Sequence, residues 1–151
     1  MKYAVLATVL ALASGLALPT GVDPVAHGQS NEASRHIDHG DDWMDKGEYD
    51  KAITEYSEAL RLDRASKRAF NNRGYAWYKK GQKDKAVSDY SEGIRLQPRY
   101  VQALNNRGYA LSDLGKLDAA IADFSKALEQ INGKAAKEFW MELDKKSGKG
   151  Q

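Results

Sequence analysis

The chain has 151 residues, of which 29% are charged and 42% hydrophobic, and its formal net charge is +2. These values are ordinary for one helical domain with terminal segments. The small net charge argues against a nucleic-acid partner, because such proteins carry a strong and clustered basic bias. The chain has no cysteine, which excludes disulfides, thiolate metal ligands and cysteine nucleophiles.

The N-terminal residues 1–28 are predicted to be a signal peptide. A short basic start precedes an apolar run over 4–18, which is shorter than the roughly 20 residues that span a bilayer. Small residues favour cleavage after Gly28, with Ala13 or Ala17 as alternative sites. Cleavage predicts a periplasmic or secreted protein, whereas an uncleaved segment would be a membrane anchor or a buried helix.

A six-residue motif organises the rest of the chain. Asn-Asn-Arg-Gly-Tyr-Ala occupies 71–76 and returns at 105–110, a shift of 34 residues, and a glycine stands one period earlier at Gly40. A period of roughly 20 to 50 residues indicates stacked supersecondary units. The same spacing relates further small and aromatic residues: Gly47, Gly81 and Gly115; Ala52, Ala86 and Ala120; Tyr56, Tyr90 and Phe124; and Ala59, Gly93 and Ala127.

Each unit is predicted to be a pair of helices. The glycines at Gly47, Gly81 and Gly115 mark the turn, since the residue that ends a helix often needs positive φ. Each second helix begins on an aspartate, which caps it or favours its positive end. The predicted second helices cover 50–62, 84–96 and 118–131, with core stripes at Ile53, Tyr56 and Leu60, at Val87, Tyr90 and Ile94, and at Ile121, Phe124 and Leu128.

The predicted boundaries follow from this register. A repeat stack needs a terminal element that covers its last apolar face, and the apolar residues after Lys134 suit that role. The predicted segments are a flexible leader at 29–32, units at 33–66, 67–100 and 101–134, a capping helix at 135–147 and a disordered tail at 148–151.

The register of small and aromatic residues resembles the tetratricopeptide repeat, a helix-turn-helix unit of 34 residues, over roughly 33–134. The resemblance implies an all-α fold: a right-handed superhelical array of three repeats plus a C-terminal capping helix, here of an exported bacterial type. It also implies binding of a protein or peptide in a concave groove lined by the first helices.

The candidate groove face is polar. Asparagine offers both a donor and an acceptor to a peptide backbone, and Asn72 and Asn106 are similar to the asparagine ladder of tetratricopeptide superhelices. Tyr75 and Tyr109 add flat contact area. The candidate binding residues are Asp38, Asp41, Asp45, Arg68, Asn71, Asn72, Tyr75, Tyr78, Lys79, Gln102, Asn105, Asn106, Tyr109, Ser112 and Asp113, with Ser34, Ile37 and Met44 on the same face of the first helix.

The charges on this face predict a gradient that would orient a basic ligand, with an acidic first unit (Asp38, Asp41, Asp45) beside a basic second one (Arg68, Lys79). A solvated helix face is the alternative interpretation. An acidic C-terminal tail is not expected as ligand. The clamp that binds such tails in related co-chaperones is matched only at Asn72, because the other positions are Ile37, Asp41, Gln102 and Asn106.

Two further features receive structural interpretations. Arg73 and Arg107 stand where the family usually has leucine, and their guanidinium groups are expected to reach acids of an adjacent helix. His36 and His39 are three residues apart on a helix, but no later histidine follows, so no metal or other cofactor is expected.

The sequence therefore predicts a non-catalytic interaction scaffold. No phosphate loop, nucleophile motif or metalloprotease helix is present. The expected role is an envelope adaptor or a factor in assembly or quality control. The alternatives are a self-assembling module that forms homo-oligomers by end-to-end stacking, and a membrane-tethered adaptor that retains its N-terminal segment.

Overall fold

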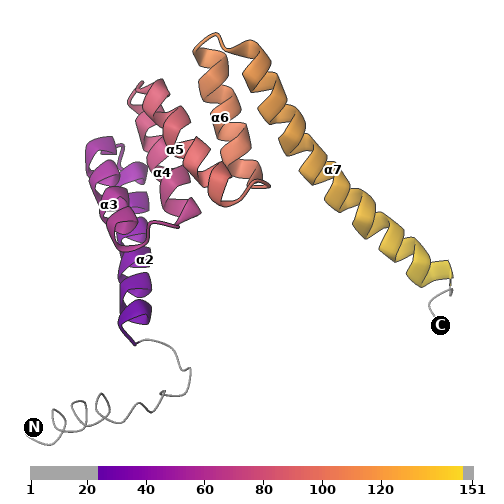
Figure 1. Cartoon of the computed structure of the whole chain (residues 1–151), viewed down its shortest axis with the longest axis horizontal. Helices are drawn as coiled ribbons and strands as arrows, with labels where there is room; N and C mark the ends of the chain where they lie inside the picture. Colours follow the sequence, from indigo (N-terminus) through magenta and orange to yellow (C-terminus); the bar gives the residue numbers. More distant parts are fainter. Residues whose placement is uncertain (1–23, 148–151) are drawn as a thin grey trace, which may run out of the picture.

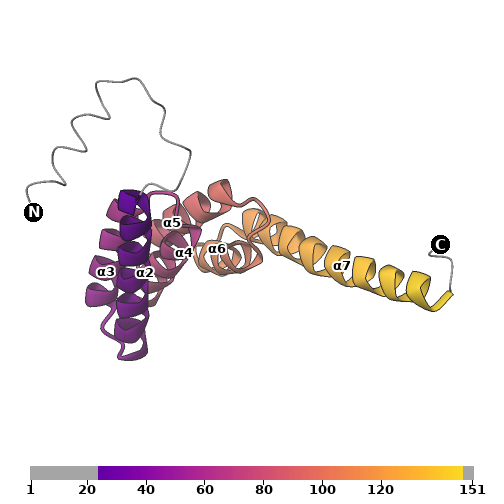
Figure 2. The ribbon, with the colours of Figure 1, turned by 90° about the horizontal axis from the view of Figure 1, so that it is seen from below.

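The computed structural model describes residues 24–147, and this part of the chain forms six α-helices (Figure 1). They are α2 (Pro24–Asp45), α3 (Tyr49–Leu62), α4 (Lys67–Lys79), α5 (Lys83–Leu96), α6 (Val101–Asp113) and α7 (Leu117–Ser147). The helices pack as the hairpins α2–α3, α4–α5 and α6–α7, which follow one another along the array (Figures 1 and 2). The predicted all-α array of three helical hairpins is confirmed. None of the described helices combines the length and the apolar character needed to cross a bilayer.

The turn inside each hairpin follows the glycine prediction. Gly47, Gly81 and Gly115 have φ of 74°, 78° and 73°. In the second hairpin, Gly81 N donates to Tyr78 O and Gln82 N donates to Trp77 O, both at 2.9 Å. This Schellman pattern satisfies carbonyls at the helix end and needs a residue in the left-handed region. The sequence therefore set the position of all three turns.

Close packing inside each hairpin depends on a second set of glycines. A Cβ added at Gly74 would lie 2.8 Å from the Tyr90 ring, and one at Gly108 would lie 2.6 Å from the Phe124 ring. The aromatic side chain thus lies directly against the backbone of the first helix. Tyr90 is 1% exposed, which places its pair in the core, whereas Phe124 is half-buried.

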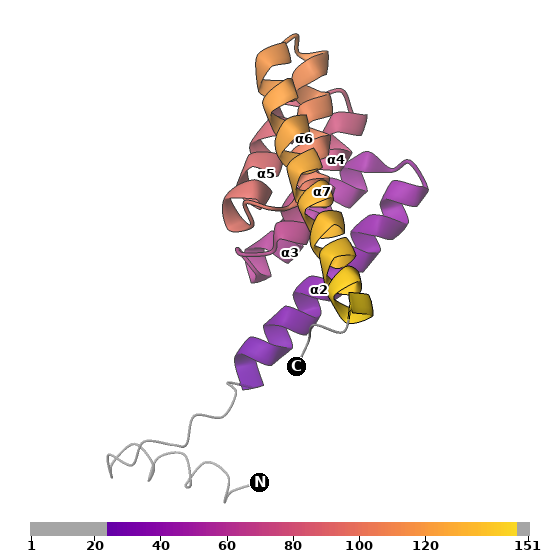
Figure 3. The same cartoon turned by 90° about the vertical axis from the view of Figure 1, so that its right-hand side faces the viewer.

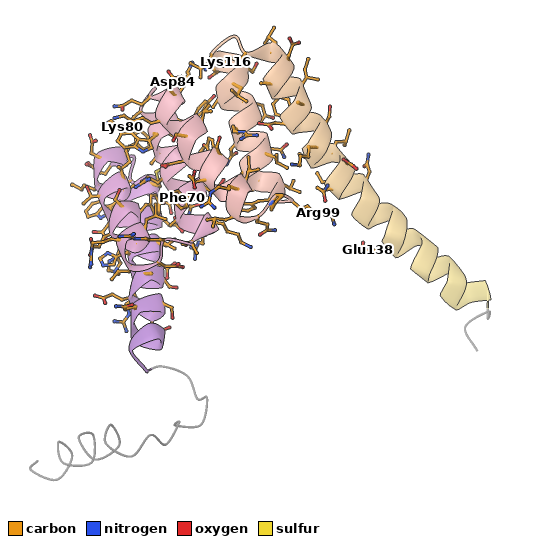
Figure 4. All side chains as sticks on the ribbon, viewed as in Figure 1. Phe70, Lys80, Asp84, Arg99, Lys116 and Glu138 are labelled. Carbon is orange, nitrogen blue, oxygen red and sulfur yellow. The ribbon has the colours of Figure 1, made fainter. Side chains whose placement is uncertain are left out.

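The predicted starts of the second helices are confirmed to within one residue, but the aspartates do not cap them. Glu48 and Gln82 are the N-cap residues, and neither makes a side-chain capping bond. Asp50 lies in the first turn, where its charge favours the positive helix end, and pairs with Lys80. The side chains of Lys80, Asp84 and Lys116 lie along the edge where the hairpins turn (Figure 4).

The first helix begins earlier than predicted. The leader expected at 29–32 is helical, because α2 starts at Pro24. Proline suits the first helical position, since its φ is already set and its missing N–H is not needed there. Ala33 is 3% exposed and is an early α2 residue in the core. The predicted signal peptide lies outside the described residues over 1–23, as does the tail at 148–151, and both remain predictions.

The last helix is longer than predicted. Residues 135–147 are helical, as expected for the cap, but they continue α7 instead of forming a separate helix. Gly133 lies inside this helix, where the strong helix formers that follow it offset its own low helix propensity. The second half of α7 therefore projects beyond α6 (Figures 1 and 2).

This projection leaves one face of α7 open. The prediction that Ile121 and Leu128 lie in the core is wrong, because they are 62% and 56% exposed. Leu117 and Ile131 add to the same face, at 58% and 50%. Figure 3 views the array from the C-terminal side, and no described element covers α7 there. Among the equivalents of Ile121 and Leu128 in the earlier hairpins, Ile53, Leu60 and Ile94 are buried and Val87 is half-buried, because another hairpin follows them.

Candidate functional site

The first helices α2, α4 and α6 are neighbours in the array and contact one another in that order. We call the surface of these three helices that carries Asp38, Asp41, Arg68, Asn72, Tyr75, Asn106 and Tyr109 the first-helix face. Hydrogen bonds join α2 to α4 and α4 to α6 across it. The structure therefore brings most of the predicted binding residues onto one continuous surface.

Asp41 is the centre of the α2–α4 junction. Its Oδ1 accepts from the Tyr56 hydroxyl at 2.6 Å and from Asn72 Nδ2 at 2.8 Å, while its Oδ2 accepts from Arg68 Nη2 at 2.7 Å. Arg68 also reaches Asp38 Oδ1 at 3.1 Å. Burial, followed by the hydrogen bond to Asp41, raises the pKa of Tyr56. Asp41 is thus occupied by three protein donors.

The asparagines form a ladder, but they bond to each other. Asn71 Nδ2 donates to Asn72 Oδ1, and Asn106 Nδ2 donates to Asn71 Oδ1, both at 3.1 Å. The prediction that Asn71 faces a ligand is wrong, because its side chain is 1% exposed and links its two neighbours. Among the described residues nothing donates to Asn106 Oδ1, so that oxygen is the part of the ladder open to a ligand.

Two equivalent tyrosines are the large exposed groups of this face. Tyr75 on α4 is 40% exposed, and Tyr109 on α6 is 60% exposed. Lys79 Nζ lies 5.5 Å from the centroid of the Tyr75 ring, and the Tyr109 ring meets Phe124 edge-on at 5.1 Å. Both rings are therefore supported from one side and open on the other, as contact residues for a bound chain need to be.

A third tyrosine closes the α4–α6 junction. The Tyr78 hydroxyl donates to Asp113 Oδ2 at 2.9 Å, and Lys83 Nζ lies 3.2 Å from the same oxygen. The hydrogen bond from Tyr78 and then the one from Lys83 lower the pKa of Asp113. This cluster is exposed, so Asp113 remains within reach of a ligand.

The predicted charge gradient is largely cancelled. Arg68 lies between the two units and pairs with both Asp38 and Asp41, so the acidic and basic patches neutralise each other. Sequence spacing missed this pairing because the three residues lie 27 to 30 positions apart and meet only when α4 packs on α2. Asp45 and Lys79 are the exposed charges of the predicted gradient that remain outside this cluster.

The other predicted residues divide by burial. Asp45, Gln102 and Ser112 are exposed, and Asn105 is half-buried. The placement of Ile37 on the first-helix face is wrong, because its side chain is 5% exposed and belongs to the core.

The two histidines are used within the fold. His36 Nδ1 lies 2.7 Å from Glu55 Oε2, and the His39 ring meets the His36 ring edge-on at 6.4 Å. Across the described residues, no three metal-ligating side chains gather into a candidate site.

The arginines have the structural partners that sequence reasoning expected. Each reaches an aspartate of the second helix in its own hairpin and a serine of the preceding hairpin. The sequence predicted acids of an adjacent helix as partners, but not which aspartates they are and not the serines, although the 34-residue period was a signal for both. The two sets are Ser57, Arg73 and Asp89, and Ser91, Arg107 and Asp123.

Comparison with known families agrees with this architecture. Sequence models described as TPR repeat match residues 40–81 and 74–115, and one described as tetratricopeptide repeat matches 101–131. No curated protein matches the sequence of the chain.

Several solved structures are similar. The second TPR of Spaghetti (RPAP3), bound to the HSP90 peptide SRMEEVD, is 29% identical to this chain and has a TM-score of 0.68. The match covers 70% of this chain and 97% of that one. The second domain of human RPAP3, in complex with the HSP70 peptide SGPTIEEVD, is 30% identical with a TM-score of 0.65, over 72% and 88%. MamA is 27% identical with a TM-score of 0.68, over 72% and 63%.

Proposed function

The chain belongs to the tetratricopeptide repeat family, and on that premise we propose that it is a non-catalytic scaffold that binds a peptide or protein segment along the first-helix face. The observation that carries the proposal is the pair of exposed, equivalent rings at Tyr75 and Tyr109 on neighbouring helices. Beside them, Asn106 Oδ1 offers an acceptor for a backbone N–H of the bound chain.

The ligand is proposed to differ from the acidic tails bound by the similar structures. Those two domains are described with peptides that end in EEVD. Here Ile37 lies in the core, and Arg68 is already paired with Asp38 and Asp41. This part of the face therefore offers no unpaired cation to an acidic terminus. The peptide SRMEEVD is therefore the discriminating probe, and no saturable binding is expected.

A peptide array tests the proposal directly. The variant Tyr75→Ala/Tyr109→Ala should lose at least about tenfold in affinity for the peptides that wild type selects, since aromatic anchors dominate such contacts. The matched control is Arg61→Ala/Arg95→Ala, which removes exposed side chains from α3 and α5. Equal binding by the tyrosine variant and wild type would place the ligand elsewhere.

The cellular role is proposed from the N-terminal segment. A cleaved signal at 1–28 would make the protein an envelope adaptor or an assembly or quality-control factor. Cleavage after Gly28 would remove the first residues of α2 but not Ala33, which is buried. Mass spectrometry of the mature N-terminus decides this point. A mature chain beginning at Gln29 supports export, whereas an intact Met1 favours the membrane-tethered alternative.

Self-assembly is the second candidate function, and the open face of α7 favours it. Head-to-tail stacking would place α2 of one copy on α7 of another. The buried contact residues Ala69 and Ala76 of α4 are replaced in α2 by Arg35 and Asp42, which are exposed. Such stacking would bury both charges, so an α7-to-α7 dimer is the better arrangement.

Sedimentation across a concentration series tests this second candidate. Wild type should dimerise, and Ile121→Lys/Leu128→Lys should remain monomeric because it places charge on the apolar face. A wild-type chain that stays monomeric at every concentration removes the self-assembly candidate.

A further inference from the structure

One place in the repeat, where the first helix packs against its second helix, carries different side chains from hairpin to hairpin. In the second hairpin, Trp77 of α4 packs beside the cores of both neighbouring units. Lys85 of α5 covers its ring, with Nζ 4.4 Å from the centroid. The first hairpin has the same arrangement, because Lys51 Nζ lies 4.4 Å from the Trp43 ring. The first two hairpins therefore share a tryptophan covered by a lysine at this place.

The third hairpin lacks both side chains. One period of 34 residues beyond Trp77 stands Leu111, and one period beyond Lys85 stands Ala119. Ser88 is likewise replaced by Ala122. At three positions between α5 and α7, the third hairpin therefore has a smaller side chain than the second hairpin has at the equivalent position.

A hollow of about 350 Å³ lies at that place. It is lined by Val87 and Ser91 of α5, Arg107 and Leu111 of α6, and Ala119, Ala122 and Asp123 of α7. Its volume is at the lower end of the roughly 300–1,000 Å³ of small-ligand sites, which suits one aromatic side chain.

The chemistry of the lining also suits an aromatic ring. Arg107 and Asp123 neutralise each other through two hydrogen bonds of 2.7 Å, so this pair adds no net charge to the lining. The planar guanidinium offers a face for stacking, while Val87, Leu111 and the alanines supply apolar contact.

We propose that this hollow is a docking site for a single indole-sized aromatic side chain of a partner protein, which takes the place that Trp77 fills in the preceding repeat. The site lies between α5 and α7, where it is also lined by the side of α6 that faces them, away from the first-helix face. It does not depend on peptide binding there, and one partner is able to engage both surfaces.

Indole and N-acetyl-tryptophanamide, titrated into the ¹⁵N-labelled full chain, are the probes. Saturable shifts of the Leu111, Ala119 and Ala122 amides are expected, with cyclohexanol at least about tenfold weaker because it lacks a π face. The variant Leu111→Trp/Ala119→Lys rebuilds the tryptophan and lysine of the second hairpin and should abolish the shifts. The exposed single variant Ala119→Trp, which leaves the core intact, should compete with the probe and weaken it.

A second variant tests the opposite change, in which the large side chains are removed from the second hairpin. Trp77→Leu/Lys85→Ala should open a second site, so that shifts appear around Ser88 as well. The proposal is overturned if wild type shows no saturable shift, if cyclohexanol binds as tightly as indole, or if Leu111→Trp/Ala119→Lys and Ala119→Trp both bind like wild type. The variant Tyr75→Ala/Tyr109→Ala, which should lose peptide binding, should show the same indole shifts as wild type. This result would separate the hollow from the first-helix face.

Discussion

The guanidinium of Arg73 donates two hydrogen bonds to the carboxylate of Asp89, from Nε to Oδ2 at 2.7 Å and from Nη2 to Oδ1 at 2.8 Å. Asp89 is 6% exposed, so its carboxylate is withdrawn from water and is held by this partner. We expect Arg73→Leu to lower the free energy of unfolding by about 3 kcal/mol, since it leaves a buried carboxylate unpaired. Urea unfolding followed by circular dichroism measures the loss.

The control is the double variant Arg73→Leu/Asp89→Leu. It should recover most of the stability, because two apolar side chains need no ionic partner. A single variant as stable as wild type would show that Asp89 finds water or another donor instead.

Replacing two of the helix glycines by alanine should have opposite effects on the stability of the array. A Cβ at Gly74 would lie 2.8 Å from the Tyr90 ring and 3.3 Å from the Ala86 carbonyl oxygen, whereas one at Gly93 would have no neighbour nearer than 3.6 Å. Gly74→Ala should therefore destabilise the array by about 1–3 kcal/mol. Gly93→Ala should stabilise it by about 0.5–1 kcal/mol, since alanine is the better helix former. Thermal melts of the two variants decide the signs. Destabilisation by Gly93→Ala would mean that the space beside it is smaller than the structure shows.

These residues show why so much of the fold was accessible from the sequence. A 34-residue period repeats each local requirement, so the turn glycine, the packing glycine and the facing aromatic ring identify one another. Turn positions and the second-helix starts depend on such local chemistry. The early start of α2 and the unbroken course of α7 lie at the ends of the array, where no further repeat supplies that constraint.

The candidate site was less accessible, for a different reason. Helical spacing predicts which side chains share a face, and it placed Tyr75 and Tyr109 correctly on the exposed side. It does not predict bonds between side chains of different helices. Arg68 neutralises Asp38 and Asp41 only because α4 packs beside α2 at that register.

Alkaline pH is expected to destabilise the core through its tyrosines. Burial raises the pKa of both Tyr56 and Tyr90 above the ordinary value of 10.0. The unfolded chain therefore releases these phenolic protons near pH 10 while the folded chain retains them, so stability is full below pH 10 and falls as the pH rises further.

The variant Tyr90→Phe isolates this effect. Phe124 fills the equivalent position of the third repeat, so stability at neutral pH should be nearly unchanged. Above pH 10, the urea midpoint of Tyr90→Phe should fall less steeply with pH than that of wild type. The midpoint of Tyr56→Phe/Tyr90→Phe should fall less steeply still. An identical alkaline profile in all three proteins would assign the decline to other groups.

The charge of the first-helix face is expected to depend on one arginine. With Arg68→Gln, the carboxylates of Asp38 and Asp41 lose their cation, and the α2 side of the face becomes acidic. An oligolysine probe should then bind about fivefold more tightly at low ionic strength, and the gain should vanish at high salt because these charges are exposed. Fluorescence anisotropy of the labelled probe measures both. The control Arg99→Gln makes the same change in net charge on the opposite edge from the hairpin turns (Figure 4). If it raises affinity equally, total charge and not the Asp38–Asp41–Arg68 cluster governs the attraction.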